Sequence, residues 1–458
     1  MARRAALARR NGEVSFWQAA LGPAPRRPPL DGDRDADVCI VGAGFTGLWT
    51  AYQLKRARPS LEVVVLERDY AGFGASGRNG GWLTPMLGPH GAPVEPALAR
   101  ALRASVADVE RVCAEEGIAC DWHAGGRLRV ARGPAQAARL RRALAAGADD
   151  EHALTAEELA ARVRVAGASA GAWTPHGVRV QPAKLVRGLA AAVERRGARI
   201  CESSPVRALR PADADGRAAA AGERGTVRAP LVLCCLEGFT PGLREQHRAL
   251  LPLNSAIVAT APLPDATWAR IGWEGRELLG DDAHAYVYAQ RTADGRIALG
   301  GRGVPYRYGS RTDRDGRTQR RTIAGLVRML HALFPATAGT PIEHAWCGVL
   351  GVARDWRPAV RLDRASGIGF AGGYVGTGLA AAHLAGRTLR DLALGEETEL
   401  TRLPWVGHRS RRWEPEPLRF LGASLVYALY RAADRREAAS ASARTSALAR
   451  AADLISGR

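Results

Sequence analysis

Short apolar runs alternate with helical patterns along this chain, the order expected when strands and helices share one fold. Buried strands are predicted at residues 38–41, 63–66, 126–130, 198–201, 231–236 and 369–371. Residues 251–260, 284–291 and 296–301 alternate between apolar and polar positions, as antiparallel strands do. Apolar residues at helical spacing predict helices over residues 95–117, 134–147, 182–197, 317–333, 379–394 and 418–433.

Units at 36–67, 178–236 and 367–394 have the character of parallel strands with helices, and strand-rich insertions separate them. We therefore predict an α/β fold with α+β insertions. A discontinuous Rossmann-like nucleotide-binding domain would carry an antiparallel-sheet substrate domain. The predicted boundaries are an N-terminal arm on the surface (1–33), the nucleotide-binding domain (34–88, 155–250 and 342–400), the substrate domain (89–154 and 251–341) and a C-terminal helical tail (401–458).

The turn after the first strand carries the clearest chemical signal. It reads Gly42-Ala43-Gly44-Phe45-Thr46-Gly47 and leads into a helical run. The first glycine permits a tight turn, the second lets the backbone approach a pyrophosphate, and the third lets helix and strand pack closely. Glu67 ends the next strand about 20 residues later, the spacing of a carboxylate that binds a ribose. The pattern predicts a dinucleotide site at the helix N-terminus.

A second glycine turn near the C-terminus narrows the choice of dinucleotide. A short strand enters Gly372-Gly373-Tyr374-Val375-Gly376-Thr377-Gly378, and a helix follows from Leu379. A reduced flavin carries negative charge near N1 and O2, which the donors and dipole of this helix start would stabilise. An enzyme that uses a nicotinamide cofactor completes its dinucleotide-binding fold within one compact stretch of sequence and needs no second glycine turn near the C-terminus. The two turns together favour FAD.

Further motifs accompany the two turns. They are Gly-Ala-Ser-Gly-Arg-Asn-Gly-Gly at 74–81, Trp346-x-Gly348, Asp355-x-x-Pro358 and Phe370-Ala371-Gly372-Gly373. In combination they resemble the FAD-dependent D-amino-acid oxidase superfamily, in particular the branch of γ-glutamylputrescine oxidoreductase and the glycine/sarcosine-oxidase-like enzymes. The resemblance implies an enzyme that oxidises the C–N bond of an amine or amino acid. Hydride transfer to flavin N5 would give an imine that hydrolyses.

The resemblance also implies, position by position, which residues hold FAD. They are Gly42, Gly44, Phe45, Thr46 and Gly47 at the pyrophosphate, Glu67 and Arg68 at the adenosine, Ala75, Ser76, Arg78, Asn79, Gly80 and Gly81 beside the pyrophosphate and flavin, Val206 at the adenine, and Gly372, Gly376, Thr377, Gly378 and Leu379 at the flavin pyrimidine edge. Some relatives attach flavin through a His or a Cys. This chain has Arg78 at the first of those positions and Gly348 at the second, with Cys347 one position off, so we expect non-covalent FAD.

Substrate residues are predicted mainly on the strand at 284–291. At a period of two, His284, Tyr286, Tyr288 and Gln290 share one face, which would be either an aromatic lid over the flavin or a polar sheet surface. Arg354 is the candidate for binding a substrate carboxylate, and a surface ion pair with Asp355 or Asp363 is the alternative. Weaker candidates are Arg302 and Trp82, whereas His90 and His123 receive no role.

The formal net charge of +19 raises the question of nucleic acid. Only Lys55 and Lys184 are lysines, and the arginines are spread along the chain rather than clustered with aromatics. We therefore expect no nucleic-acid partner, with a basic RNA-associated flavoprotein as the alternative. Some relatives place a lysine near N5 to help oxygen accept electrons. Neither lysine belongs to the predicted substrate sheet, so we expect slow oxygen reduction, or an Arg or His in that role.

No apolar run approaches the ~18 residues that span a bilayer, and Met1–Arg10 lacks the apolar core of a signal peptide. The odd count of seven cysteines, without metal-ligand or Cys-x-x-Cys spacing, indicates a reducing cytoplasm. We expect the tail to dock on the body, with peripheral membrane contact as the alternative.

A flavin monooxygenase or reductase is the alternative enzyme. Those enzymes usually end the FAD site with Ala-x-Gly-Asp, whereas Gly373 follows Ala371-Gly372 here, and a second Gly-x-Gly-x-x-Gly in mid-chain is absent. We expect a cytoplasmic FAD enzyme that takes a small amine or amino acid and passes electrons to oxygen or another acceptor.

Overall fold

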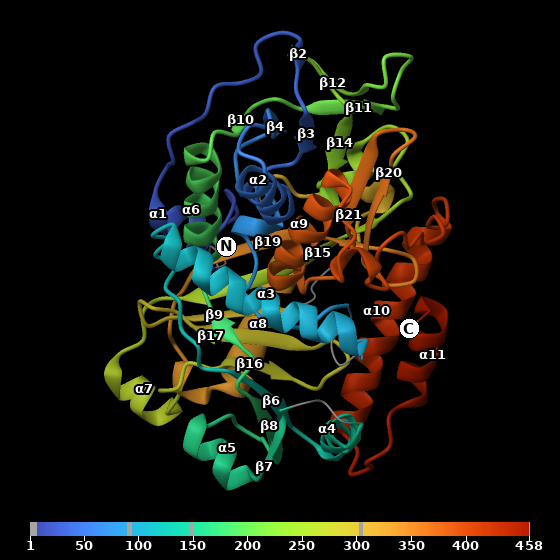
Figure 1. Ribbon diagram of the computed structural model, residues 1–458. Helices are drawn as coiled ribbons and strands as arrows, with labels where there is room; N and C mark the ends of the chain where they lie inside the picture. Colours follow the sequence, from blue (N-terminus) through green and yellow to red (C-terminus); the bar gives the residue numbers. More distant parts are fainter. Residues whose placement is uncertain (1–6, 89–93, 147–149, 302–305, 458) are drawn as a thin grey trace, which may run out of the picture.

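The computed structural model describes residues 7–88, 94–146, 150–301 and 306–457, and two large sheets organise it (Figure 1). The first sheet has the order β10 (Arg199–Cys201), β4 (Val63–Leu66), β3 (Val38–Val41), β14 (Leu231–Cys234), β21 (Ile368–Gly372) and β20 (Ala359–Asp363). Its first five strands run parallel and β20 is antiparallel. The predicted discontinuous Rossmann-like α/β arrangement is confirmed.

Both faces of this sheet are covered, which explains why its central strands are apolar throughout. One face packs on α2 (Phe45–Ala57), α3 (Pro96–Glu115), α6 (Pro182–Arg195) and α9 (Gly378–Leu394). The other packs on a small sheet of β11 (Val206–Arg210), β12 (Ala218–Gly222), β13 (Gly225–Ala229) and β2 (Arg34–Asp35). Helices α2 and α9 approach closely because Gly386 has no side chain, since a Cβ there would lie 2.7 Å from Trp49 Cβ.

The second sheet is nine-stranded and mostly antiparallel. Its order is β1 (Arg10–Asn11), β19 (Ile342–Val352), β15 (Leu251–Thr260), β18 (Ile297–Gly301), β17 (Val287–Arg291), β16 (Leu278–Asp281), β6 (Arg127–Ala131), β8 (Ala170–Thr174) and β7 (His152–Leu154). Its apolar core includes side chains of α5 (Ala156–Arg162), α7 (Asp265–Ile271) and α8 (Arg320–Leu333). Strands β8 and β19 belong to this sheet although the predicted boundaries assign them to the nucleotide-binding domain.

Within its described residues, the N-terminal arm is partly buried, around Ser15, Trp17 and Gln18, whereas the prediction placed it on the surface. Strand β1 pairs with β19, and α1 (Phe16–Leu21) lies against α6. The Trp17 side chain is 2% exposed and meets Trp346 of β19 edge to face, with ring centroids 5.9 Å apart. The prediction failed because these partners are distant in the sequence: β19 lies more than three hundred residues after α1, and α6 about 160 residues after it.

The C-terminal tail is helical, as predicted, but it contains more helix than the prediction gave. Helix α10 (Leu418–Ala438) extends beyond residue 433, and α11 (Ala447–Ser456), which was not predicted, packs beside it (Figure 1). Helix α10 contacts the body through Ala423 and Tyr427. None of the helices in the described part of the chain combines the length and apolar character that a membrane crossing requires.

Trp17 offers a test of the docked arm. Trp17→Ala should lower the free energy of unfolding by about 3–5 kcal/mol, the usual cost of removing a large buried aromatic side chain. Chemical denaturation of the purified protein measures it. Glu13→Ala, an exposed change in the same arm, should alter the value by less than about 0.5 kcal/mol. Equal effects would mean that the arm does not dock.

Candidate active site

The first glycine turn admits only glycine at two positions. Gly42 has a φ of +107°, and a Cβ there would lie 2.7 Å from the Cys235 carbonyl oxygen. A Cβ at Gly47 would lie 2.0 Å from the Gly42 carbonyl oxygen, so α2 could not begin where it does. The Phe45 amide, in the first turn of α2, donates to Ser76 Oγ at 2.8 Å. The turn and the 74–81 loop are therefore held together.

Glu67 follows β4 at the same sheet edge. One carboxylate oxygen accepts from the Ala43 amide at 2.9 Å and the other from the Asp69 amide at 3.0 Å. Burial raises the pKa of Glu67, and these two amide donors oppose the rise. Because each carboxylate oxygen can accept more than one hydrogen bond, Glu67 keeps acceptor capacity for ribose hydroxyls in the cavity that it lines.

Side chains from outside the 74–81 loop donate hydrogen bonds to its carbonyl groups. The loop includes the 3-10 turn η1 (Ala75–Gly77). Ser15 Oγ donates to the Gly77 carbonyl (2.7 Å), Trp346 Nε1 to that of Arg78 (2.9 Å) and Trp17 Nε1 to that of Asn79 (2.8 Å); the Gln290 amide donates to that of Gly80. Four consecutive carbonyls are thus bound by side chains from α1, its N-cap and two strands of the large sheet.

With those carbonyls engaged, amides of the loop keep free donors. Within the described residues, the Asn79 and Gly80 N–H groups form no hydrogen bond with protein atoms, and both residues line the cavity. The neighbouring start of α2 is capped by Gly44, which has no side chain to occupy the helix end. Free amides beside an open helix N-terminus suit a pyrophosphate, so these residues fit FAD.

Arg78 is 1% exposed and lines the same cavity. Its guanidinium donates to the carbonyls of Phe73 (2.7 Å), Arg314 (2.8 Å) and Asp313 (3.3 Å) and lies 4.4 Å from the centroid of the Phe73 ring. No carboxylate pairs with it among the described residues. Burial lowers the pKa of Arg78, although not enough to remove its charge near neutral pH. The loop therefore carries a buried positive charge.

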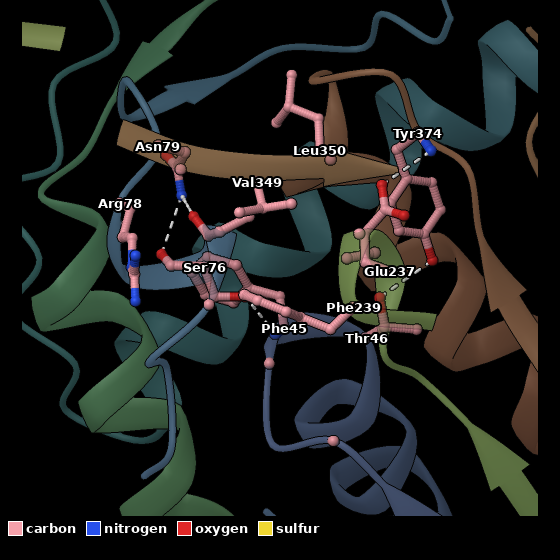
Figure 2. Close-up of a pocket in the computed structure, with 18 of the residues that line it drawn as sticks. Phe45, Thr46, Ser76, Arg78, Asn79, Glu237, Phe239, Val349, Leu350 and Tyr374 are labelled. Atoms are coloured by element: carbon pink, nitrogen blue, oxygen red, sulfur yellow. Dashed lines mark hydrogen bonds between the residues drawn. The ribbon is translucent and has the colours of Figure 1, made fainter. Parts of the chain in front are cut away.

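The far end of the cavity lies under β19 and the second glycine turn. Figure 2 shows Ser76, Arg78 and Asn79 on one side and Glu237 and Tyr374 on the other, with Val349 and Leu350 of β19 between them. Tyr374 Oη lies 3.0 Å from Thr46 Oγ1, which links the second turn to α2. Sequence reasoning did not identify Glu237, Phe239 or Tyr374 as site residues, although Tyr374 lies inside the quoted motif.

An aromatic wall from the large sheet closes the third side. Tyr288 Oη lies 3.0 Å from Ser255 Oγ of β15, and its ring meets Trp82 edge to face, with centroids 6.0 Å apart. The ring sits between two glycines, since a Cβ would lie 2.7 Å from it at Gly80 and 2.2 Å from it at Gly300. Tyr286 also lines this cavity.

The cavity, of about 310 Å³, brings most of the predicted residues together. Its lining includes Gly42, Gly44, Phe45, Thr46, Glu67, Arg68, Ala75, Ser76, Arg78, Asn79, Gly80, Val206, Gly376, Thr377, Gly378, Leu379, Tyr286, Tyr288 and Trp82. Gly47, Gly81 and Gly372 support it from behind without lining it, and Cys347 and Gln290 also lie outside the lining. Gln290 therefore acts on the loop carbonyl rather than on the cavity.

His284 does not share a face with Tyr286 and Tyr288. Strand β17 begins at Val287, and His284 lies in the preceding turn. Its Nε2 lies 2.9 Å from a Glu437 carboxylate oxygen, and its ring stacks on Tyr430 of α10. The prediction from two-residue periodicity failed because helix α10 of the tail binds this turn.

Arg354 lies outside the cavity lining as well. It pairs with Glu414 at 3.0 Å, donates to the Ser456 carbonyl and lies over the Trp413 ring. The predicted alternative, an ion pair, is the arrangement found, but the partner is Glu414 rather than Asp355 or Asp363. A ligand in this cavity would have to be bound by other groups.

Other predicted positions lie elsewhere. The Cys347 thiol donates to the Arg317 carbonyl, and burial raises its pKa to about 12, which disfavours the thiolate. His123 Nε2 lies 3.0 Å from the Gly275 carbonyl oxygen. His90 and Arg302 fall outside the described residues.

A nucleotide-binding turn, a second glycine turn and an aromatic wall line one cavity. This combination is typical of a flavin-dependent oxidoreductase. The comparisons agree: the chain matches the family of FAD dependent oxidoreductases (DAO) over residues 37–392. This protein belongs to that family, and its cofactor is FAD.

Named relatives cover most of the chain. It is 29% identical over 420 residues to γ-glutamylputrescine oxidoreductase of Escherichia coli, covering 87% of this chain and 94% of the relative. It is 28% identical over 402 residues to the probable oxidoreductase OrdL of Rhizobium meliloti, covering 84% and 89%. Among solved structures it resembles glycine oxidase from Geobacillus kaustophilus, with a TM-score of 0.71 and 20% identity, covering 82% of this chain and 100% of that chain.

Gln290 gives a test of the loop carbonyls. Gln290→Ala leaves the Gly80 carbonyl without its partner, a loss of about 1–3 kcal/mol for a buried polar group, so FAD should bind about 5- to 150-fold more weakly. Titration of the apoprotein with FAD, followed by flavin fluorescence, measures the dissociation constant. Gln319→Ala, at a glutamine whose side chain accepts from Arg321 rather than binding the loop, serves as the control and should leave affinity unchanged.

Asp281 gives a test by pH. It ends β16 and accepts from the Val287 amide (2.9 Å), and burial raises its pKa to about 7. An acid with a raised folded pKa binds more protons folded than unfolded, so the free energy of unfolding should fall as pH rises from about 4 to 7, by up to about 4 kcal/mol. Asp281→Asn should lack this fall in denaturation series at pH 5 to 8, whereas exposed Asp265→Asn should retain it.

Proposed function

We propose that this FAD-dependent oxidoreductase oxidises the C–N bond of a small amine or amino acid. The observation that carries the proposal is the continuity of one cavity from the Gly42–Glu67 nucleotide end to the wall of Tyr286 and Tyr288. The γ-glutamylputrescine oxidoreductase and glycine oxidase relatives support the substrate class. Bound FAD supplies an acceptor for the hydride of the substrate C–H bond.

The residues of the wall have a positioning role in this proposal. Tyr288, held by Ser255 and flanked by Gly80 and Gly300, fixes one side of the space where a substrate would lie. Trp82 and Tyr286 add apolar surface that excludes water and favours the neutral form of the amine. Backbone donors at Gly376–Gly378 would face the flavin end that gains negative charge.

Access to this space is proposed to pass Tyr286. A second cavity, of about 990 Å³, shares Tyr286 with the first and lies between α3, the β16–β17 turn and the C-terminal helices. Trp356 and Trp405 line it together with arginines of α4 (Pro134–Ala145) and α11. The tail would then form part of the entrance.

The electron acceptor is proposed from the positions of the cations. Lys55 donates to the carbonyls of Pro59 and Leu61, and Lys184 pairs with Asp121, so neither lines the cavity. Slow oxygen reduction is the first expectation. Arg78 is the buried cation of the lining that would take the alternative role of assisting oxygen.

A cytoplasmic location is also part of the proposal. All seven cysteines are buried and free. A protein that keeps buried thiols unpaired, Cys234 beside Cys235 among them, suits a reducing compartment.

Anaerobic reduction tests the function. The purified protein should show a flavin spectrum, and at least one member of a panel of primary amines, secondary amines and amino acids should bleach it without oxygen. A protein that takes up no FAD, or a flavin bleached by NADPH and by no amine, would contradict the proposal.

Tyr288 tests the wall with whichever amine reduces the flavin. Tyr288→Phe and Ser255→Ala should each slow reduction about fivefold, the value of one hydrogen bond of about 1 kcal/mol. The double variant should lose no more than either single one. Tyr308→Phe, at an exposed tyrosine, is the matched control. Stopped-flow absorbance gives the rates, and additive losses would separate the two residues.

A further inference from the structure

Glu237 places a carboxylate inside the cavity. It lies in the 3-10 turn η2 (Glu237–Gly242), directly after β14, in a left-handed conformation with a φ of +47°. One oxygen accepts from the Gly373 amide at 3.1 Å and the other from the Tyr374 amide at 3.2 Å. Figure 2 shows the carboxylate beside Tyr374, below Leu350. The position is too constrained for a side chain that merely fills space.

No positive charge compensates this carboxylate. Among the described residues Glu237 has no ion pair, and the three residues of β19 nearest to it, Val349, Leu350 and Gly351, carry no charge. Arg68 reaches the same turn but lies over the Phe239 ring, 4.9 Å from its centroid. Glu237 is therefore a lone acidic group, and burial raises its pKa to about 7.

Two titratable groups lie near this end of the cavity, and neither changes charge near neutral pH. Tyr374, from the second glycine turn, faces Glu237, and Cys235, which follows β14, interacts with Tyr374. Burial raises the pKa of both well above their usual values. The first turn of α9 contributes no acid, and α2 contributes the Thr46 hydroxyl through Tyr374. Of the described groups at this end of the cavity, only Glu237 changes its charge between pH 6 and 8.

The amides that Glu237 occupies lie immediately before the start of α9. That helix start is the part of the site proposed to stabilise negative charge on the reduced flavin. A resident carboxylate uses two of the nearby donors and adds a negative charge of its own. Its presence makes further negative charge in the cavity less favourable.

We propose that Glu237 tunes the electron affinity of the bound flavin, holding a negative charge at this end of the cavity in alkaline solution and losing that charge in acid. The inference rests on the FAD site proposed above. Glu237 is a positioning and electrostatic residue that touches no substrate in this scheme. The enzyme would accept electrons from its amine more readily when Glu237 is protonated.

The test compares the reduction potential of the holoenzyme with that of Glu237→Gln across pH 5.5 to 8.5, by equilibrium with a redox dye. The two should coincide at pH 5.5, where Glu237 is neutral. At pH 8.5 the variant should hold about fivefold more reduced flavin at the same dye ratio, the size of one partly buried charge interaction. A purely structural role would shift the potential equally at every pH.

Asp281→Asn is the matched control, because Asp281 is also buried with a pKa near 7 but does not line this cavity. Its potential should follow the wild type at every pH. Glu237→Asp, which keeps the charge, should restore the pH-dependent fall and serves if the Gln variant does not fold. The inference is overturned if Glu237→Gln and the wild type have the same reduction potential at every pH. Failure to bind FAD overturns the proposed function instead.

Discussion

The loop at 74–81 holds its shape because side chains from elsewhere bind its carbonyl groups one after another. Ser15, Trp17, Gln290 and Trp346 together fix the peptide planes from residue 77 to residue 80. A peptide plane with its carbonyl bound on one side presents its N–H on the other. The free amides beside α2 depend on these hydrogen bonds to the carbonyl groups. The site proposed for the pyrophosphate depends on them as well.

Local sequence predicts the nucleotide end of the site well. The turn at Gly42–Gly47, the carboxylate of Glu67 and the lining residues of the second turn are encoded within short stretches, because each needs a glycine or an acid at a fixed spacing. Gly42 and Gly47 show why, since any side chain there would collide with backbone. The strands of the first sheet were predictable for the same reason, as apolar runs covered on both faces.

What sequence reasoning missed involves contacts between distant segments. His284 has the spacing of a site residue, but α10 binds it, and Arg354 is held by Glu414 and the C-terminal helix. Gln290 was expected on the substrate face and instead binds the Gly80 carbonyl. Nothing in the sequence marked Glu237 as a site residue, because a single acidic residue after a strand is common. Periodicity describes one element, whereas these roles are decided by the element packed against it.

The pairing of β1 with β19 has a consequence for how the protein is made. The ribosome delivers Trp17 first, the 74–81 loop soon after, and Trp346 only when three quarters of the chain has emerged. Until then the arm has no strand to join, and the loop lacks Trp346 and, at first, Gln290 as well. The nucleotide domain cannot mature as an independent early unit, as the N-terminal domains of larger proteins generally do. Completion of the cofactor loop therefore awaits three quarters of the chain, and a bulky group added before β1 would have to be accommodated beside β19.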